Sequence, residues 1–147
     1  MLRLRELADG DAESVRRIHA DGAAADLWFG AMTGTQALAY VREAAANPAL
    51  LLVRGIEVDG DLLGVVRLRL DPDRGTGRLS YIVREDARGN GHATAAVRRF
   101  LTGDDLPARV LAVHREANPA SGRVLAKAGF TLTRTGAGLV HHERACR

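Results

Sequence analysis

Leucines alternate with charged residues at the beginning of the chain, and this period of two predicts a short strand around Leu2 and Leu4. Residues 9–25 open with aspartates that can cap a helix and are rich in alanine, so they predict a helix. Its positions at helical spacing are Val15, Ile18, His19 and Gly22. A second helix is expected to start after Thr35 and to stop at Asn47-Pro48, because the residue before a proline avoids the helical region. Its apolar face is expected to comprise Leu38, Val41 and Ala45.

From residue 50 the pattern changes to that of extended chain. The runs 50–58 and 61–70 flank Asp59-Gly60, a pair typical of a type I′ hairpin turn, in which both central residues have positive φ. One face of the second run is expected to carry Leu62, Val66, Leu68 and Leu70. A polar loop over residues 71–77 then leads to a strand over residues 79–83.

The last third of the chain returns to helical periodicity. The turn Arg88-Gly89-Asn90-Gly91 precedes an amphipathic helix with Ala93, Ala96, Val97, Phe100 and Leu101 on one face. Beyond Pro107 we expect a strand over 110–113, a helix from Asn118-Pro119 to Gly129, and short strands over 130–134 and 139–142. The order β-α-α-β-β-β-α-β-α-β-β predicts an α/β protein (α+β, with a mixed sheet and interleaved helices). We expect a single domain that spans residues 1–147.

Composition narrows the class of protein. With 147 residues, 46% hydrophobic and 27% charged, the chain has the composition of a compact globular domain. Cys146 is the only cysteine and has no disulfide partner, which favours a reducing cytoplasm. No apolar run reaches the roughly 20 residues that cross a membrane. The net charge is +3, but basic residues are scattered and aromatics are only 4%. We therefore expect a cytoplasmic protein with no membrane and no nucleic-acid partner.

The turn before the third helix has the physical features of a phosphate site. The first N–H groups of a helix lack intrahelical acceptors, and the helix dipole adds positive potential there. Gly89 and Gly91 would let a ligand approach the backbone, and Arg88 would add a full charge. An ordinary glycine-containing turn is the alternative. A dinucleotide-binding turn fits less well, because Thr94 stands at the position of the third glycine.

Two segments together make the chain resemble the GNAT superfamily of N-acetyltransferases. Arg88, Gly91 and Ala93 match the family's Arg/Gln-x-x-Gly-x-Gly/Ala signature, and Asn118, Ser121, Gly129 and Phe130 match its later Asn-x-x-Ser/Ala helix that ends in Gly-Phe. The second segment is most similar to the branch of the ribosomal-protein alanine N-acetyltransferases, RimJ and RimL. The resemblance covers the whole chain and implies the acyl-CoA N-acyltransferase fold with acetyl-CoA as cosubstrate and no metal.

The resemblance also assigns binding roles. It places the coenzyme A pyrophosphate on Arg88, Gly89, Asn90, Gly91, His92, Ala93 and Thr94. It places the pantetheine arm beside the strand residues Tyr81, Ile82 and Val83, in the manner of an added strand, with an amide near Tyr81 facing the thioester carbonyl. Asn118 and Ser121 would flank the arm and the sulfur.

The catalytic groups of the family are only partly present. Many relatives carry a tyrosine acid where this chain has Leu125, so Ser121 is the catalytic candidate that would donate a hydrogen bond to the leaving sulfur. Relatives with a carboxylate base carry it where this chain has Val113. The neighbouring His114 is expected to point to the opposite face of its strand and to pack there.

Other titratable residues offer weaker alternatives for the base. Glu57 on the hairpin and Asp26 in the loop 26–34 are conceivable, although solvated carboxylates are common at such places. Trp28 and Phe29 in that loop would pack against the core or line an acceptor cleft. His141 and His142 are expected on opposite faces of one strand, which argues against a shared metal.

The missing base bears on the acceptor. An α-amino group titrates near about 7.7–8.0 and a lysine near about 10.4, so deprotonating lysine costs about 3.5 kcal/mol more. We therefore expect direct acetyl transfer to a primary amine, with a protein or peptide N-terminus favoured, by a monomer or homodimer. The alternatives are an acetyltransferase for a small-molecule amine and a catalytically inactive acyl-CoA-binding regulatory module.

Overall fold

The computed structural model describes residues 1–20 and 30–146 and contains one mixed sheet of seven strands in the order β1-β2-β3-β4-β5-β7-β6. The strands are β1 (Leu2–Arg5), β2 (Leu51–Val58), β3 (Asp61–Asp71), β4 (Thr76–Val83), β5 (Arg109–Arg115), β6 (Thr131–Gly136) and β7 (Leu139–Ala145). Neighbouring strands pair antiparallel except β4 and β5, which pair parallel. The predicted α/β fold class and the predicted order of strands and helices are confirmed.

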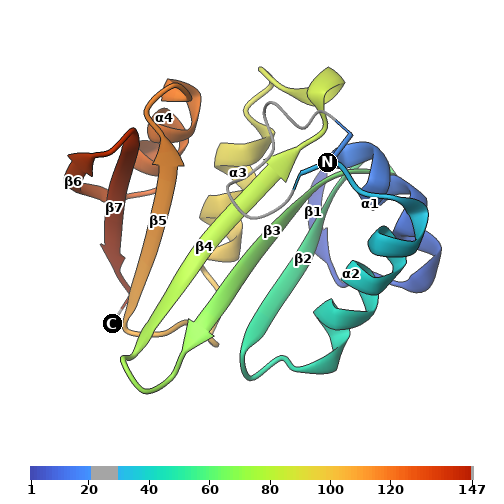
Figure 1. Cartoon of the computed structure of the whole chain (residues 1–147), viewed down its shortest axis with the longest axis horizontal. Coiled ribbons are helices and arrows are strands. Elements are labelled where there is room, and N and C mark those ends of the chain that lie inside the picture. Colours follow the sequence, from blue (N-terminus) through green and yellow to red (C-terminus); the bar gives the residue numbers. More distant parts are fainter. Residues whose placement is uncertain (21–29, 147) are drawn as a thin grey trace.

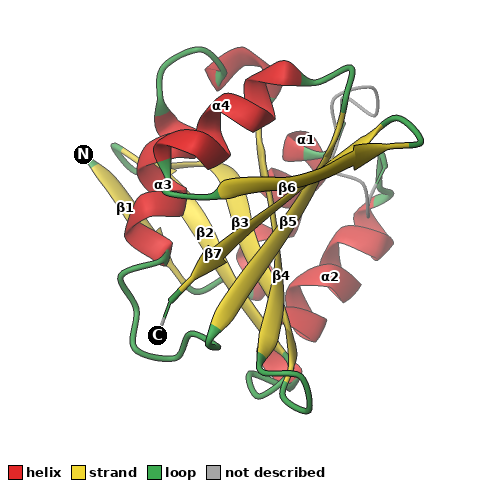
Figure 2. Ribbon diagram, turned by 90° about the vertical axis from the view of Figure 1, so that its left-hand side faces the viewer, coloured by secondary structure: helices red, strands yellow, loops and turns green. Residues whose placement is uncertain are grey.

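Helices cover both faces of the sheet, as Figure 2 shows. They are α1 (Ala12–Ile18), α2 (Gly34–Ala46), α3 (His92–Phe100) and α4 (Pro119–Lys127), with short 3-10 turns η1 (Asp9–Asp11) and η2 (Glu85–Ala87). One apolar cluster lies between the sheet and α1 and α2, and a larger one lies between the sheet and α3 and α4. Within the described residues, none of the helices has the length and apolar character that crossing a membrane requires.

The helices before β2 differ in detail from the prediction. The α1 helix ends at Ile18, and residues 21–29, including Asp26, Trp28 and Phe29, lie outside the described residues. The α2 helix begins two residues earlier than predicted, because Thr33 caps it. The Thr33 side chain accepts a hydrogen bond from the Gln36 backbone N–H, and the Gln36 side chain accepts one from the Thr33 backbone N–H. Its buried residues are Ala37, Tyr40 and Val41, whereas Leu38 is half-buried and Ala45 is exposed, so the predicted face was partly wrong.

The predicted hairpin turn is confirmed by positive φ at both Asp59 (51°) and Gly60 (85°). Beyond it the pairing shifts, because Glu57 pairs with Leu62 but Ile56 pairs with Gly64, which leaves Leu63 as the extra residue of a β-bulge. The extra residue means that side chains before and after the bulge, at positions that would otherwise share a face of the sheet, point to opposite faces. Leu62 joins the apolar cluster under α1 and α2, whereas Val66 and Leu68 join the other one, so the predicted common face of these residues was wrong.

The polar loop expected over residues 71–77 is shorter than predicted. Pairing continues to Asp71 opposite Thr76, and Gly77 is already buried in β4. The sequence pattern missed this because Gly77 has weak strand propensity, whereas burial between neighbouring strands determines its conformation. The strands β5, β6 and β7 are likewise one to three residues longer than predicted. A second turn with positive φ, at Ala137 (53°) and Gly138 (77°), joins β6 to β7.

The central strands β4 and β5 are joined along only part of their length. Their parallel pairing runs from Thr76 opposite Arg109 to Leu79 opposite Ala112 and is not continued beyond that pair. In Figure 1 the two strands lie close at the bottom of the view and diverge toward the top, where α3 and α4 begin. The divergence leaves one edge of β4 without a partner strand in the middle of the sheet.

Candidate functional site

A cavity of about 620 Å³ lies where β4 and β5 diverge. Its walls are the ends of these two strands, the first turn of α3 and one side of α4. The site residues expected from the sequence that line it are Tyr81, Ile82, Val83, Arg88, Gly89, Gly91, His92, Ala93, Thr94, Asn118 and Ser121. The fold thus brings together two segments that are far apart in the sequence.

Asn90 is the expected site residue that does not line the cavity. Its side-chain amide donates hydrogen bonds to the carbonyl oxygens of Ala87 at 3.2 Å and Arg88 at 3.4 Å. Asn90 therefore stabilises the turn from within, and its side chain is directed toward the turn instead of toward a ligand.

The turn before α3 presents open backbone donors to the cavity. Gly89 and Gly91 have φ of +82° and +78°, a conformation that glycine adopts without strain. Gly91 is the N-cap residue of α3, and no side chain caps the helix. The first intrahelical bond is donated by Ala95, so the N–H groups of His92, Ala93 and Thr94 have no partner within the helix. This arrangement suits an anion.

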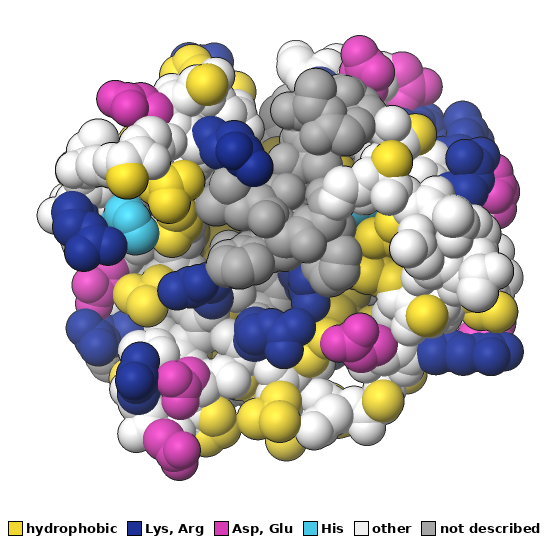
Figure 3. Space-filling view, in the orientation of Figure 1, with side chains coloured by type: hydrophobic (Ala, Val, Ile, Leu, Met, Phe, Trp, Pro, Cys, Tyr) yellow, Lys and Arg dark blue, Asp and Glu magenta, His cyan; other side chains and the backbone are white. Residues whose placement is uncertain are grey.

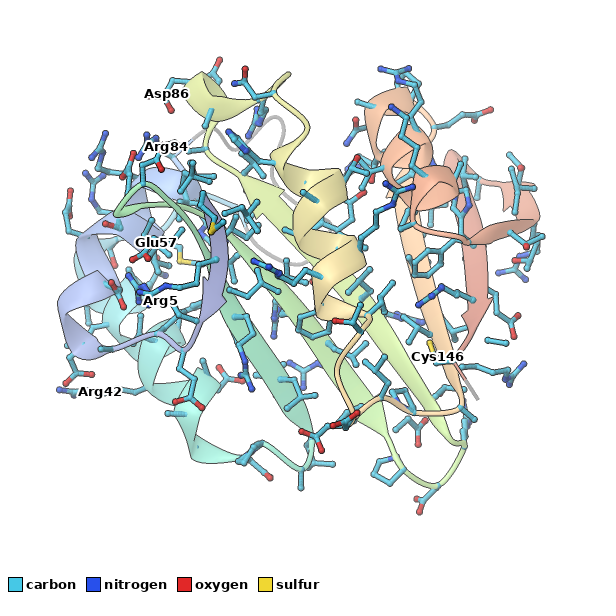
Figure 4. The ribbon with its side chains drawn as sticks, turned by 180° about the vertical axis from the view of Figure 1, so that it is seen from behind. Arg5, Arg42, Glu57, Arg84, Asp86 and Cys146 are labelled. Carbon is cyan, nitrogen blue, oxygen red and sulfur yellow. The ribbon has the colours of Figure 1, made fainter. Side chains whose placement is uncertain are left out.

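Two arginines fix the segment between β4 and α3. The Arg88 Nε donates to the Val83 carbonyl oxygen at 2.9 Å, which ties the turn to the end of β4. Arg84 bridges Asp61 at 2.9 Å and Asp86 at 2.5 Å. Figure 4 shows Arg84 and Asp86 close together at one end of the molecule. The hydrogen bond from Arg84 holds the pKa of Asp61 below its usual value. The glycine turn is therefore held by charged groups on both sides.

The cavity edge of β4 offers unpaired backbone groups. The Arg84 N–H donates to the Leu63 carbonyl oxygen of β3 at 2.7 Å. Because the direction of hydrogen bonding alternates along a strand, the backbone groups of Tyr81 and Val83 face away from β3, toward the cavity. The Val83 carbonyl oxygen accepts from Arg88, which leaves the N–H and C=O of Tyr81 for an extended ligand.

The α4 helix contributes two polar side chains to the opposite wall. Asn118 occupies the N-cap position as predicted, but its side chain does not cap the helix and is exposed at the cavity. The Ser121 Oγ lies 2.6 Å from the Tyr81 hydroxyl. From the sequence, a role was expected only for the backbone of Tyr81. The contact joins residues forty positions apart on a strand and a helix, so no local pattern could have predicted it.

The charge of the cavity wall is of one sign. Among the described residues that line it there is no aspartate or glutamate, whereas Arg88, Arg115, Arg123 and Lys127 contribute to the wall. Such surroundings attract an anion and disfavour the protonated form of an amine. Elsewhere on the face of Figure 3, basic and acidic side chains are interspersed and form no continuous basic stripe.

A pair of stacked histidines lies beneath α4. His114 and His142 are buried, with ring centroids 5.1 Å apart and Nε2 atoms 3.1 Å apart. The His114 Nδ1 lies 2.7 Å from the Arg115 carbonyl oxygen, which can only accept, so this nitrogen carries the proton. In the neutral pair His142 then donates to His114, and the buried Nδ1 of His142 is an acceptor without a partner.

The histidine pair corrects part of the sequence analysis. His114 was expected to pack, which is confirmed, but His114 also lines the cavity with both ring nitrogens engaged. Its closest approach to α4 is at Gly122, where an added Cβ would lie 3.0 Å from His114 Nε2. His141 points the other way, as expected, and contacts Arg134 Nη2 at 3.3 Å. The pairing of His142 with His114 was missed because it depends on the register of β5 against β7.

We expect the histidine pair to make folding stability depend on pH. Burial lowers the pKa of His142 below 6.5, and the nearby His114 acts in the same direction. The unfolded chain then binds the proton more readily, so stability is complete above about pH 6.5 and decreases as the pH falls toward the folded-state pKa. Thermal denaturation between pH 7.5 and 5.5 should show a decrease in Tm of a few degrees that is smaller in His142→Leu. The His141→Gln control should retain the decrease of the wild type; equal pH dependence in all three proteins would contradict this prediction.

Of the alternative acids, Glu57 lies away from the cavity, and so does the cysteine. Glu57 is paired with Arg3 and Arg5 at 2.8 and 2.9 Å, and the Arg5 hydrogen bond lowers its pKa. Figure 4 shows Arg5 and Glu57 together on the side of the molecule opposite α4. Cys146 is half-buried, donates its backbone N–H to the Ala108 carbonyl oxygen at 2.8 Å just before β5, and does not line the cavity.

A comparison with known families assigns almost the whole chain. A family described as "Acetyltransferase (GNAT) domain" matches residues 1–131. A search among curated proteins found no significant match.

Solved structures of the same fold include several with informative descriptions. An acetyltransferase of the GNAT family from Bacillus anthracis has a TM-score of 0.84 and 15% identity over 99% of this chain and 95% of that chain. The RimL ribosomal L7/L12 α-N-protein acetyltransferase in complex with coenzyme A has a TM-score of 0.82 and 16% identity over 98% and 92%. A spermidine N-acetyltransferase SpeG chimera from Vibrio cholerae and hSSAT has a TM-score of 0.82 and 15% identity over 99% and 95%. At these identities the likeness concerns the fold.

Proposed function

The chain belongs to the GNAT acetyltransferase family, and from that premise we propose that it transfers the acetyl group of acetyl-CoA directly to a primary amine, preferably a peptide α-amine. The observation that carries the proposal is the cavity at the divergence of β4 and β5, which opens onto the uncapped N-terminus of α3. A search for clusters of three or more potential metal ligands among the described residues found none.

The cavity fits coenzyme A in four respects. The open N–H groups of α3 and the Arg88 charge are donors for the pyrophosphate, and an added Cβ at Gly91 would meet no atom within 4 Å, so the backbone is accessible. The free C=O of Tyr81 suits an amide of the pantetheine arm, which would lie beside β4 as an added strand. The Tyr81 N–H is also the donor available to a developing oxyanion. Asn118 and Ser121 line the opposite wall.

The acceptor preference follows from the charges around the cavity. Direct transfer requires a neutral amine, and neither Val113 nor His114 supplies a free base. The basic wall favours the neutral form of a bound amine, and an α-amine is already partly neutral near about pH 7.7–8.0. A lysine acceptor would need a base. A polyamine would need acidic partners, which the described part of the cavity wall does not provide.

The test is coenzyme A release from acetyl-CoA at pH 7.5 with a matched pair of peptides. One peptide has a free N-terminus and no lysine, and the other has a blocked N-terminus and one lysine. We expect kcat/KM to favour the α-amine by roughly 100-fold, in line with the difference in amine pKa. Faster acetylation of lysine would contradict the acceptor class. Saturable acetyl-CoA binding without release for peptides, polyamines and amino acids would instead support an acyl-CoA-binding module.

A further inference from the structure

The two hydroxyl groups that meet across the cavity define a direction for proton donation. The Tyr81 hydroxyl donates to the Ser121 carbonyl oxygen at 3.2 Å and lies 2.6 Å from Ser121 Oγ, where either oxygen can donate. A phenol is a stronger acid than an aliphatic hydroxyl, so Tyr81 is the donor in the shorter contact, and its single proton is shared between the two Ser121 oxygens. With Tyr81 as donor to Ser121 Oγ, the Ser121 proton is free to bond elsewhere.

The Ser121 hydroxyl proton is directed toward the cavity. Among the described residues, Tyr81 is the one partner of the Ser121 hydroxyl, and the hydroxyl makes none of the bonds to a preceding helix carbonyl that serines often form. Ser121 itself lines the cavity. Burial raises the pKa of Tyr81 to about 12, so the phenol keeps its proton throughout the working pH range of a protein.

We propose that the Tyr81 hydroxyl is a positioning residue that holds the Ser121 hydroxyl as a hydrogen-bond donor aimed at the leaving sulfur of the thioester. This inference rests on the proposed function. In place of the tyrosine acid that relatives carry where this chain has Leu125, it assigns proton donation to Ser121 supported by Tyr81. Tyr81 acts from β4, on the other side of the cavity from that helix position.

The proton transfers balance without a further reactant. The amine nitrogen forms a bond to the acetyl carbonyl carbon, and the carbon–sulfur bond breaks with its electron pair on sulfur. Sulfur takes the Ser121 proton, Ser121 takes the Tyr81 proton, and the proton that the nitrogen loses returns through water to Tyr81. The products are the amide and the thiol, and both hydroxyl groups are restored.

A double-mutant cycle at saturating acetyl-CoA tests the dependence of Tyr81 on Ser121. Ser121→Ala should lower kcat by about 100-fold, at the lower end of effects of proton donors, and Tyr81→Phe should lower it by about 10-fold. Because Tyr81 acts through Ser121, the double variant should match Ser121→Ala within about 3-fold. KM for acetyl-CoA should stay within about 3-fold in all variants. Tyr40→Phe removes the other tyrosine hydroxyl of the chain and should leave kcat unchanged.

A second measurement needs no turnover. A donor aimed at sulfur stabilises a thiolate, so the thiol of bound coenzyme A, titrated by its absorbance, should have a pKa about one unit lower on the wild type than on Ser121→Ala or Tyr81→Phe. A lowered value in the wild type without amine acetylation would support the hydroxyl pair while refuting the proposed function. Equal values in all three proteins, or a full 10-fold effect of Tyr81→Phe in the Ser121→Ala background, would overturn the inference.

Discussion

Replacing Gly91 by aspartate should raise the KM for acetyl-CoA by roughly 100-fold, whereas asparagine at the same position should raise it by less than about 5-fold. Gly91 has φ of +78° at the start of α3 and open space around its Cα. Asparagine and aspartate have the same shape and tolerate this conformation similarly. Only aspartate adds a negative charge beside the pyrophosphate. One such charge about 6 Å away costs about 2.7 kcal/mol at an effective dielectric constant of 20.

Steady-state kinetics with varied acetyl-CoA, together with thermal denaturation, would measure this effect. Aspartate at a helix N-terminus interacts favourably with the helix dipole, so its Tm should be no lower than that of Gly91→Asn. Relative to Gly91→Asn, the aspartate variant should therefore bind acetyl-CoA more weakly without being less stable. Equal KM values for the two variants would place the pyrophosphate away from α3 and contradict the binding role of this turn.

Gly64→Ala should destabilise the fold by about 2–4 kcal/mol, with a decrease in Tm of about 5–10 °C. An added Cβ would lie 2.7 Å from the Ile82 carbonyl oxygen and 2.9 Å from Ile56 Cδ1. The first of these atoms belongs to the backbone of β4 and cannot rotate away. Relief would need a shift of β3 against β4, next to the bulge and next to the strand end that lines the cavity.

Gly136→Ala in β6 is the matched control, because an added Cβ there meets no atom within 4 Å. It should change the free energy of unfolding by less than about 0.5 kcal/mol. Chemical denaturation of both variants and the wild type would compare them. If Gly64→Ala were as stable as Gly136→Ala, β3 and β4 would have to accommodate a Cβ only 2.7 Å from the Ile82 carbonyl oxygen, which would contradict this prediction.

Local signals predicted the elements whose conformation depends on a few neighbouring residues. Asp59-Gly60 predicts its turn because few other pairs adopt positive φ twice. Pro48 and Gly129 mark the ends of α2 and α4 through backbone restrictions of their own. The glycines and Arg88 before α3 point to an anion site for the same reason, since a helix start has open donors whatever surrounds it.

Features that depend on the pairing of distant strands could not be predicted. The bulge at Leu63 alters which side chains face which helices, and a period-two pattern cannot detect one extra residue. The contacts of His114 with His142, and of Tyr81 with Ser121, join residues on different elements. The alternation of side chains along a strand predicts which face of the sheet a residue lies on, but not which residue of another element it contacts.

By itself, the sequence determined the order of the elements, the glycine turn and the family resemblance, because each of these is written in short segments with their own backbone and periodicity constraints. The tertiary structure alone decided where β4 and β5 stop pairing, which charges line the resulting cavity and which hydroxyl supports Ser121. These features arise from register and packing between elements that are distant in the sequence, and burial there outweighs local propensity.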